Sequence, residues 1–512
     1  MSELTRSGSR SRAKLLNRCG QVSAALGVGL LLLGFSSCAT VGATGGATES
    51  ERATSVEEAP PGEAPPGEKT LDRAALEAVR TRFPGAEFTG IELRPTTARR
   101  EAGARPRRER PRSVRRAELS ERAATRIMRY REREAVVEET VSALSLEERV
   151  GQLFMVGFHS FVDGSPVHSL SARHREVMDA VQPGGVILFG PNIDTVEQVR
   201  TYIQELQDAA GLQLIIATDQ EGGGVSRLTE SGKLGATEFP DAEKLGSAGD
   251  PWLAEQAGEV TARELQALGI TMNFGPVADV NTNRANPVIA ERAFSSDVEV
   301  TGRMVAATVR GLQRENISAV LKHFPGHGDT ALDTHYDRAV VEHDRERLET
   351  VEWPPFERGI EAGADAVMTA HVAVPALTGD DRPATIAPEI IQRVLREELG
   401  FDGVVITDSL AMGALRGYGE GEIAIRALAA GVDMILRPSA PEAAYRAVLN
   451  AVQDGRLSED RIEQSVRRIL RLKYDRGLIG PEIPQTTALP PEEVLGSPRH
   501  RDVRDLIDRA LE

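Results

Sequence analysis

Short apolar runs alternate with longer amphipathic segments between residues 141 and 480. The longer segments, such as TVEQVRTYIQELQDA and PEIIQRVLREEL, repeat apolar residues at helical spacing, whereas the short runs are mostly apolar or β-branched. Because strands buried on both faces and separated by helices are typical of parallel sheets, this alternation predicts an α/β fold. The eight runs are LFMVGF at 153, GVILFG at 185, LIIATD at 214, ITMNFG at 270, SAVLKHF at 318, AVMTAHV at 366, GVVITDS at 403 and DMILRP at 433.

Eight such units predict a single (β/α)8 TIM-like barrel rather than an open doubly wound sheet. A dinucleotide-type glycine fingerprint does not follow the first run, which also disfavours the open sheet. Functional residues of such barrels lie where strands end, at the C-terminal rim. Polar residues stand at four of these ends, namely Asp219, Lys322 with His323, His371 and Asp408. The sequence therefore predicts a site at this rim.

The charge of the chain is negative overall and unevenly distributed. A formal net charge of −16 over 512 residues argues against nucleic acid as a partner. Between Arg99 and Glu134, however, 14 Arg stand against 6 Glu, a net of +8, so the remainder totals −24. This Arg-rich run could contact an anionic surface, but we favour a solvated linker.

The N-terminus resembles a bacterial lipoprotein signal. Basic residues precede an apolar run over 22–35, which is too short to span a bilayer comfortably, and Cys38 follows it. The resemblance implies that Cys38 is lipidated and that the chain is exported, and Ala39 in place of Asp favours the periplasmic side of the outer membrane. A plain secretory signal is the alternative. Since Cys19 is the chain's other cysteine, a disulfide framework or a cysteine-based zinc site in the folded part is excluded.

Composition divides the chain into four parts. Residues 1–38 form the predicted signal peptide, and residues 39–140 a disordered, low-complexity and Arg-rich linker with little to bury. Residues 141–480 form the catalytic barrel. Residues 481–512 are a C-terminal tail with a final helix. We expect a monomer that has a membrane as its partner through the lipid anchor.

Four motifs in the barrel resemble glycoside hydrolase family 3, of the β-N-acetylglucosaminidase (β-hexosaminidase) type. They are DQEGGGVSR at 219–227, ERAFSSD at 291–297, KHFPGHGDTALDTH at 322–335 and ITDSLAMGAL at 406–415. The third is highly specific, and the resemblance covers about residues 145–475. It implies a retaining exo-hydrolase that removes β-linked N-acetylglucosamine from the non-reducing end of an aminosugar oligosaccharide or muropeptide, without a cofactor.

Asp408 matches the nucleophile of this family. A carboxylate at the tip of an apolar strand is also rigidly held for attack on an anomeric carbon. The alternative is an N-cap of a following helix, although Ser409 could take that place. The resemblance assigns the acid/base role to His335 on the sequence Asp333-Thr334-His335. An imidazole titrates near neutrality, and Asp333 would orient its other nitrogen.

The remaining motif residues match substrate-binding positions. Asp219 can accept hydrogen bonds from sugar hydroxyls, and the donors would be Arg227, Arg292, Lys322 and His323. His327 is expected to shape its loop, and His371 has no assigned role. Gly224 stands where many relatives carry Arg, which leaves the saccharide preference open.

A metal site is the weaker interpretation of the histidine-rich motif. His323 and His327 lie four residues apart and His335 follows eight residues later, spacings that suit a helix face. Proline and glycine at 325, 326 and 328 prevent that helix, so we expect no metal. Two other functions remain open. They are a phosphorylase of the same family, in which a neutral His does not repel phosphate, and a non-catalytic wall-binding lipoprotein.

Overall fold

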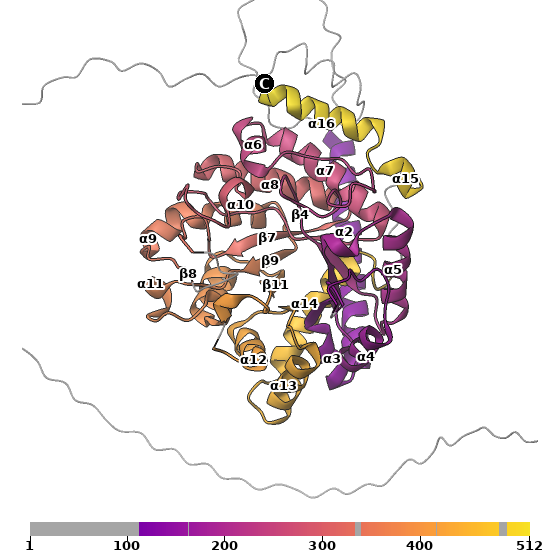
Figure 1. Cartoon of the computed structure of the whole chain (residues 1–512), viewed down its shortest axis with the longest axis vertical. Helices are drawn as coiled ribbons and strands as arrows, with labels where there is room; N and C mark the ends of the chain where they lie inside the picture. The colour runs from indigo at the N-terminus through magenta and orange to yellow at the C-terminus, as the bar shows by residue number, and fades with distance from the viewer. Residues whose placement is uncertain (1–111, 162, 333–338, 416, 481–488) are drawn as a thin grey trace, which may run out of the picture. The chain divides into compact units, whose positions relative to one another are not determined.

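The computed structural model describes residues 112–161, 163–332, 339–415, 417–480 and 489–512 (Figure 1). The predicted signal peptide with Cys38, most of the predicted linker, and the catalytic candidates Asp333 and His335 lie outside these residues. Within the described part, no helix is long and apolar enough to cross a membrane.

The centre of the fold is a nearly closed barrel of eight parallel strands, so the predicted α/β barrel is confirmed. Their order around the sheet is β11-β9-β7-β6-β3-β2-β1-β12, and a parallel bridge between Ile406 and Met434 brings the two ends of the sheet together. Each predicted run contains one strand. The strands are β1 (Phe154–Gly157), β2 (Gly185–Leu188), β3 (Ile215–Thr218), β6 (Met272–Asn273), β7 (Ser318–Phe324), β9 (Ala366–Thr369), β11 (Val404–Thr407) and β12 (Ile435–Leu436).

Helices between the strands surround the barrel (Figure 1). Two short pairings lie outside the sheet, β4 (Gln220–Gly222) with β5 (Val225–Ser226) and β8 (Ala339–Val340) with β10 (Val372–Ala373). The helices are α2 (Arg112–Ala143), α3 (Leu146–Gln152), α4 (Ala172–Val181), α5 (Val196–Asp208), α6 (Ala242–Ser247), α7 (Pro251–Leu268), α8 (Val298–Arg314), α9 (Arg345–Arg347), α10 (Pro354–Glu361), α11 (Pro375–Thr378), the π-helix η5 (Glu389–Glu398), α12 (Glu420–Ala430), α13 (Pro441–Gln453), α14 (Glu459–Asp475), α15 (Pro491–Val494) and α16 (Pro498–Leu511).

Local sequence explains where these helices begin and how closely they pack. Ser145 and Glu148 form a reciprocal capping box at the start of α3, and Asp297 accepts from the Val300 amide at the start of α8. Gly311 lets α8 approach α7, because a Cβ there would lie 2.2 Å from the Glu255 carbonyl oxygen. The strand residues between these helices are almost entirely buried, which accounts for their apolar sequences.

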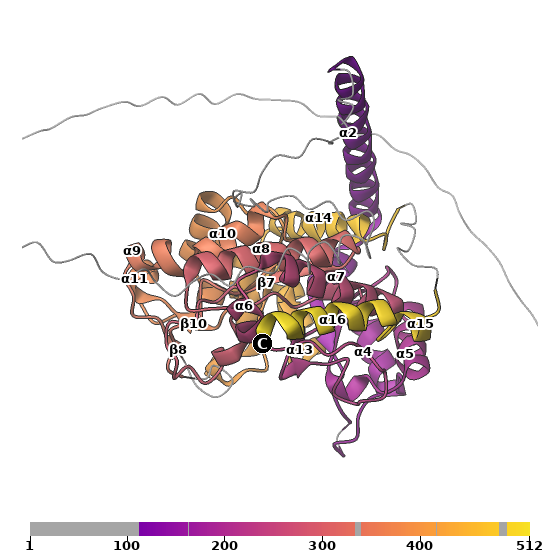
Figure 2. The ribbon, with the colours of Figure 1, turned by 90° about the horizontal axis from the view of Figure 1, so that it is seen from above.

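The segment predicted as a linker up to residue 140 is helical from Arg112. Helix α2 packs its last turns on α14, where Arg471 binds Glu134 at 2.7 Å and Arg467 binds Glu138 at 2.8 Å. Val137 is fully buried there. The prediction of a disordered linker is therefore wrong for this part, because apolar residues at helical spacing give α2 a face to bury. Figure 2 shows the first turns of α2 extending beyond the other helices.

The C-terminal segment ends in the helix α16, which packs against α7. Glu264 of α7 accepts from the Gly496 amide at 2.9 Å, and its carboxylate lies 2.9 Å from His500 Nδ1. Both side chains are buried. These contacts join residues beyond the predicted barrel boundary to the barrel's helical layer.

Lys473 of α14 is an amine buried beside α3. Its Nζ donates to Gln152 Oε1 at 2.7 Å, and its side chain is fully buried. Burial lowers the pKa of Lys473 from its ordinary value of 10.5 to about 7. Between these two pH values the unfolded chain binds more protons than the folded protein. The free energy of unfolding therefore rises with pH across this window.

Replacing Lys473 by methionine is expected to remove this pH dependence. Through this group, the wild-type free energy of unfolding should rise by up to about 4 kcal/mol between neutral pH and the ordinary pKa of lysine. Urea unfolding at several pH values measures the slope in both proteins. Lys244→Met, at an exposed lysine of α6, should keep the wild-type slope. Equal slopes in the wild type and Lys473→Met would contradict the expectation.

Candidate active site

The predicted rim residues lie together at the C-terminal ends of the barrel strands. Asp219 directly follows β3, Lys322 and His323 belong to the end of β7, His371 follows β9, and Asp408 directly follows β11. Because all these strands are parallel, their ends share one edge of the barrel, which we call the mouth. The predicted position of these residues at one rim of the barrel is therefore confirmed.

Lys322 is the centre of a buried charge network. Its Nζ lies 2.8 Å from Asp219 Oδ1 and 2.5 Å from Glu221 Oε1, and Arg292 makes a two-pronged contact with Glu221 at 2.8 and 2.9 Å. Burial alone would raise the pKa of Glu221, but the charges of Arg292 and Lys322 hold it well below its ordinary value. The carboxylates of Asp219 and Glu221 in turn raise the pKa of Lys322 against the effect of burial. Both cations therefore stay charged.

Glu221 was not among the predicted substrate contacts, although it follows the same strand as Asp219. It accepts from both cations, and its side chain is 5% exposed, whereas that of Asp219 is 18% exposed. Glu221 thus positions Lys322 and Arg292 from below the surface. Asp219 is the carboxylate of this network that remains partly exposed at the mouth.

Asp279 is a second buried carboxylate that the sequence did not single out. Its Oδ2 lies 2.7 Å from His323 Nδ1, and its Oδ1 accepts from the His327 amide at 2.7 Å. The Asp279 contact fixes the His323 ring and directs Nδ1 toward the carboxylate. Burial lowers the pKa of His327, whose Nδ1 lies 2.6 Å from the Thr330 hydroxyl. This geometry agrees with the prediction that His327 shapes its loop.

Asp408 is held at the tip of β11 by backbone contacts. Its amide donates to the Thr369 carbonyl of β9 at 3.1 Å, and its Oδ1 accepts from the Ser409 amide at 2.7 Å. The next described helix that follows, α12, begins at Glu420 with Gly419 as its N-cap, after a short 3-10 turn. The alternative role of Asp408 as an N-cap is therefore wrong.

His371 holds the turn that follows Asp408. Its Nε2 donates to the Ser409 carbonyl at 3.1 Å, and its Nδ1 lies 2.7 Å from the Thr385 hydroxyl. Burial lowers the pKa of His371, while the charge of Asp408 acts in the opposite direction. The fully buried ring is thus a positioning group beneath the carboxylate.

The Lys322 network and Asp408 share the same edge of the barrel. Lys322 and His323 are adjacent in β7, which brings the Lys322 network beside the Asp279–His323 pair, and the charge of Asp408 acts on His371 and His327. The residues at the ends of β3, β7, β9 and β11, with Arg292 and Asp279 bound to them, are called the polar cluster. Among the predicted residues, it contains Asp219, Arg292, Lys322, His323 and Asp408.

Arg227 does not join this cluster. It forms an ion pair with Glu230 on its own loop. Among the described residues it has no hydrogen bond or ion pair with Asp219 or Lys322. Its charge instead acts on His159, at the end of β1. Arg227, which the sequence predicted as a substrate-binding donor, therefore makes no direct polar contact with Asp219 or Lys322.

The other two predicted catalytic residues, Asp333 and His335, lie outside the described residues. Asp329 precedes them in the chain and His343 follows them, and His343 Nε2 lies 2.5 Å from Asp329 Oδ2. The Thr282 hydroxyl also donates to Asp329, at 2.7 Å. In the part of the chain that the structure describes, no three metal-binding side chains surround a common point.

Gly224, where the resemblance leads one to expect Arg, has room for a side chain. No atom lies within 4 Å of the position that a Cβ would take there. Gly224→Arg is therefore expected to change the free energy of unfolding by less than about 0.5 kcal/mol. A glycoside panel would show whether the added cation alters saccharide preference, and chemical denaturation measures the stability. A loss of several kcal/mol would contradict the open geometry.

Comparisons with known proteins relate the chain to a family of enzymes. Residues 145–472 match the model described as glycosyl hydrolase family 3 N terminal domain. Beta-hexosaminidase A of Pseudoalteromonas piscicida is 32% identical over 399 residues, which cover 70% of this chain and 65% of that relative. The chain thus spans just under two thirds of the relative's length.

Two solved structures share the fold and part of the sequence. A glycoside hydrolase family 3 beta-N-acetylglucosaminidase from Paenibacillus sp. str. FPU-7 is 40% identical with a TM-score of 0.64, over 72% of this chain and 68% of that chain. A beta-glucoside phosphorylase is 26% identical with a TM-score of 0.65, over 73% of this chain and 66% of that chain. Hydrolase and phosphorylase thus both occur among its structural neighbours.

Proposed function

The chain belongs to glycosyl hydrolase family 3 and is an enzyme, and we propose that it is a retaining exo-β-N-acetylglucosaminidase acting on peptidoglycan fragments or related aminosugar polymers. Its relatives include a beta-hexosaminidase and a solved beta-N-acetylglucosaminidase. The observation that carries the proposal is the polar cluster at the mouth, in which Asp408 after β11 and the Lys322 network at the ends of β3 and β7 share one edge of the barrel.

The cluster has the chemical parts that binding and attack on a pyranose require. Asp219 can accept from hydroxyl groups, while Lys322 and His323 are held as donors by the buried carboxylates of Glu221 and Asp279. In this proposal, the bound sugar has its anomeric carbon against the Asp408 carboxylate, which a rigid mouth favours. Asp408 attacks that carbon as the bond to the leaving oxygen breaks, which produces a glycosyl–aspartate intermediate.

His335 supplies the proton in this proposal. Its imidazolium protonates the leaving oxygen in the first step, and the neutral ring then takes a proton from the water that attacks the intermediate. Asp333 orients the ring and stabilises its charged form. Two successive inversions at the anomeric carbon give net retention, and Asp408 leaves as the free carboxylate.

The site of action proposed for the enzyme follows from its N-terminus. Cys38 would be lipidated and would anchor the exported chain on the periplasmic side of the outer membrane. Incorporation of a labelled fatty acid into the wild type, and its loss in Cys38→Ala, tests this anchor. Labelling that survives in Cys38→Ala would contradict it.

Side-by-side assays test the proposed activity. The wild type is incubated with an aryl β-N-acetylglucosaminide, an aryl β-glucoside and purified muropeptides. We expect release of N-acetylglucosamine, with the β-anomer appearing first by NMR. Preference for the glucoside, or first appearance of the α-anomer, would contradict the proposal. Binding to insoluble wall without any hydrolysis would favour the non-catalytic alternative.

A phosphorylase is the second candidate, because a beta-glucoside phosphorylase is among the structural neighbours. A neutral histidine base would not repel incoming phosphate as a carboxylate base would. The same assays are repeated with inorganic phosphate, and the products are separated by chromatography. Free sugar in both conditions supports the hydrolase, and diversion to sugar 1-phosphate supports the phosphorylase.

A further inference from the structure

One side of the mouth has a cation for which the proposed reaction has no use. The polar cluster occupies the ends of β3, β6, β7, β9 and β11. The ends of β12, β1 and β2 are adjacent in the barrel order and close the remaining side. Arg437 directly follows β12, and Phe189 directly follows β2.

The Arg437 side chain extends across this side of the mouth. Its guanidinium carbon lies 5.0 Å from the centre of the Phe189 ring, and its Nη1 lies 3.4 Å from the Ser409 hydroxyl. Phe189 follows β2 and Ser409 follows Asp408 at the end of β11, with β1 and β12 between them. A group that contacts both ends must lie over the intervening strand ends. The guanidinium thus contacts the residue that directly follows the proposed nucleophile in the chain.

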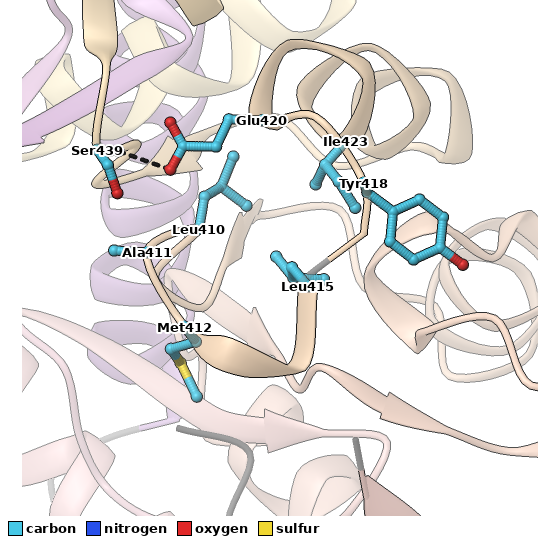
Figure 3. Close-up of a pocket in the computed structure, with 8 residues that line it drawn as sticks. All are labelled: Leu410, Ala411, Met412, Leu415, Tyr418, Glu420, Ile423 and Ser439. Atoms are coloured by element: carbon cyan, nitrogen blue, oxygen red, sulfur yellow. Dashed lines mark hydrogen bonds between the residues drawn. The ribbon is translucent and has the colours of Figure 1, made fainter. Parts of the chain in front are cut away.

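This guanidinium has no carboxylate partner among the described residues. Burial lowers the pKa of Arg437, and Glu420 is the acidic residue that opposes this effect. Glu420, however, is engaged by the backbone, because its two oxygens accept from the Ser439 and Ala440 amides at 2.8 and 3.0 Å. Figure 3 shows the contact between Glu420 and Ser439. Both residues line a cavity of about 190 Å³.

A half-buried cation without a counter-ion is costly unless a ligand supplies the negative charge. No described carboxylate supplies that charge to Arg437 through an ion pair. Burial and the charges of Arg437 and Arg227 lower the pKa of the neighbouring His159, while the charge of Glu230 acts in the opposite direction. The aromatic face of Phe189 holds the guanidinium in place without neutralising it. The site is therefore suited to an oxyanion.

We propose that Arg437 binds an oxyanion at the mouth, namely a carboxylate carried by the substrate. This inference rests on the proposed function. N-acetylglucosamine is itself uncharged, so an anionic group must come from the rest of the substrate. The lactyl ether of a muramic acid residue is a carboxylate of this kind. Inorganic phosphate, as an acceptor, would present the same chemistry.

A matched pair of substrates tests the inference. One is the β-linked disaccharide of N-acetylglucosamine and N-acetylmuramic acid, and the other is its lactyl methyl ester, which lacks the charge. The ratio of kcat/KM for the acid to that for the ester is measured in the wild type, Arg437→Gln and Arg437→Lys. Arg426→Gln, which removes an exposed arginine of α12 paired with Glu422, is the control. Each reaction is repeated with inorganic phosphate.

We expect Arg437→Gln to lower the acid-to-ester ratio by about 10-fold, Arg437→Lys to lower it less, and Arg426→Gln to leave it unchanged. Phosphate-dependent sugar 1-phosphate that disappears in Arg437→Gln would assign the site to phosphate. An unchanged ratio without any phosphate-dependent product would overturn the inference.

A different result would show that the proposed function is wrong. In that case, the wild type would cleave neither the aryl N-acetylglucosaminide nor the disaccharide. Thermal shifts then test Arg437 without activity, using N-acetylmuramic acid, its methyl ester and inorganic phosphate as probes. Stabilisation of the wild type by the acid or phosphate, but not of Arg437→Gln, would still support the oxyanion site. Equal shifts in both proteins, or none, would overturn it.

Discussion

Replacing Asp408 by alanine is expected to lower kcat by at least about 1,000-fold, because the proposed nucleophile is removed while the turn around it keeps its backbone contacts. The amide of residue 408 still donates to the Thr369 carbonyl, and His371 still holds Ser409. The variant should therefore unfold at nearly the wild-type temperature. Turnover of an activated aryl glycoside, measured beside a thermal unfolding curve, checks both expectations.

The chain offers a matched control at the opposite end of the same strand. Asp402 precedes β11, and its side chain is 84% exposed. Asp402→Ala removes a carboxylate of the same type without touching the mouth and should keep wild-type turnover. Retention of most activity by Asp408→Ala, or a comparable loss in Asp402→Ala, would end the assignment of Asp408.

Replacing Glu221 by glutamine is expected to reduce both stability and activity. The amide keeps the shape but leaves Lys322 and Arg292 without their shared buried counter-ion, a change that costs about 3–5 kcal/mol when one partner of a buried ion pair is removed. Both donors would then shift relative to Asp219, so kcat/KM should fall by roughly 100-fold. Urea unfolding and steady-state kinetics measure the two effects.

The pH dependence of the free energy of unfolding gives a second test of the role of Glu221. The folded-state pKa of Glu221 lies below its ordinary value of 4.5. Its contribution is thus present above that value and is lost as the pH falls toward the lower, folded-state pKa. Below pH 4.5, the free energy of unfolding of Glu221→Gln should therefore fall less steeply with decreasing pH than that of the wild type. Glu230→Gln, which removes the exposed partner of Arg227 from the same loop, should leave stability and the pH profile unchanged.

The barrel could be predicted from sequence because the period and apolar content of its strands are local properties. All eight apolar runs became strands, and the polar residues at four run ends became the mouth. Helix α2 was missed because the Arg-rich composition concealed its apolar face. Val137 lies on this face and is fully buried in the structure, in which α2 packs on α14.

The partners within the site could not be predicted in the same way. Asp279 contacts His323 across 44 residues of sequence, and Asp219 contacts Lys322 across 103. Which carboxylate neutralises which cation depends on how the strand ends meet, and no local pattern contains that information. The sequence showed polar residues after ITMNFG and an Arg after DMIL, but gave no reason to assign a role to Asp279 or Arg437.

The central claim is that Asp408 and His335 act on opposite sides of one sugar. Trapping the covalent intermediate tests it most directly. With an aryl glycoside whose leaving group needs little protonation, His335→Ala should form the intermediate but hydrolyse it slowly, since it lacks the base for the second step. Rapid quenching, proteolysis and mass spectrometry should then find one N-acetylhexosamine on the peptide containing Asp408. A sugar attached to a different residue, or no covalent adduct during a demonstrated burst of aryl release, would contradict the account.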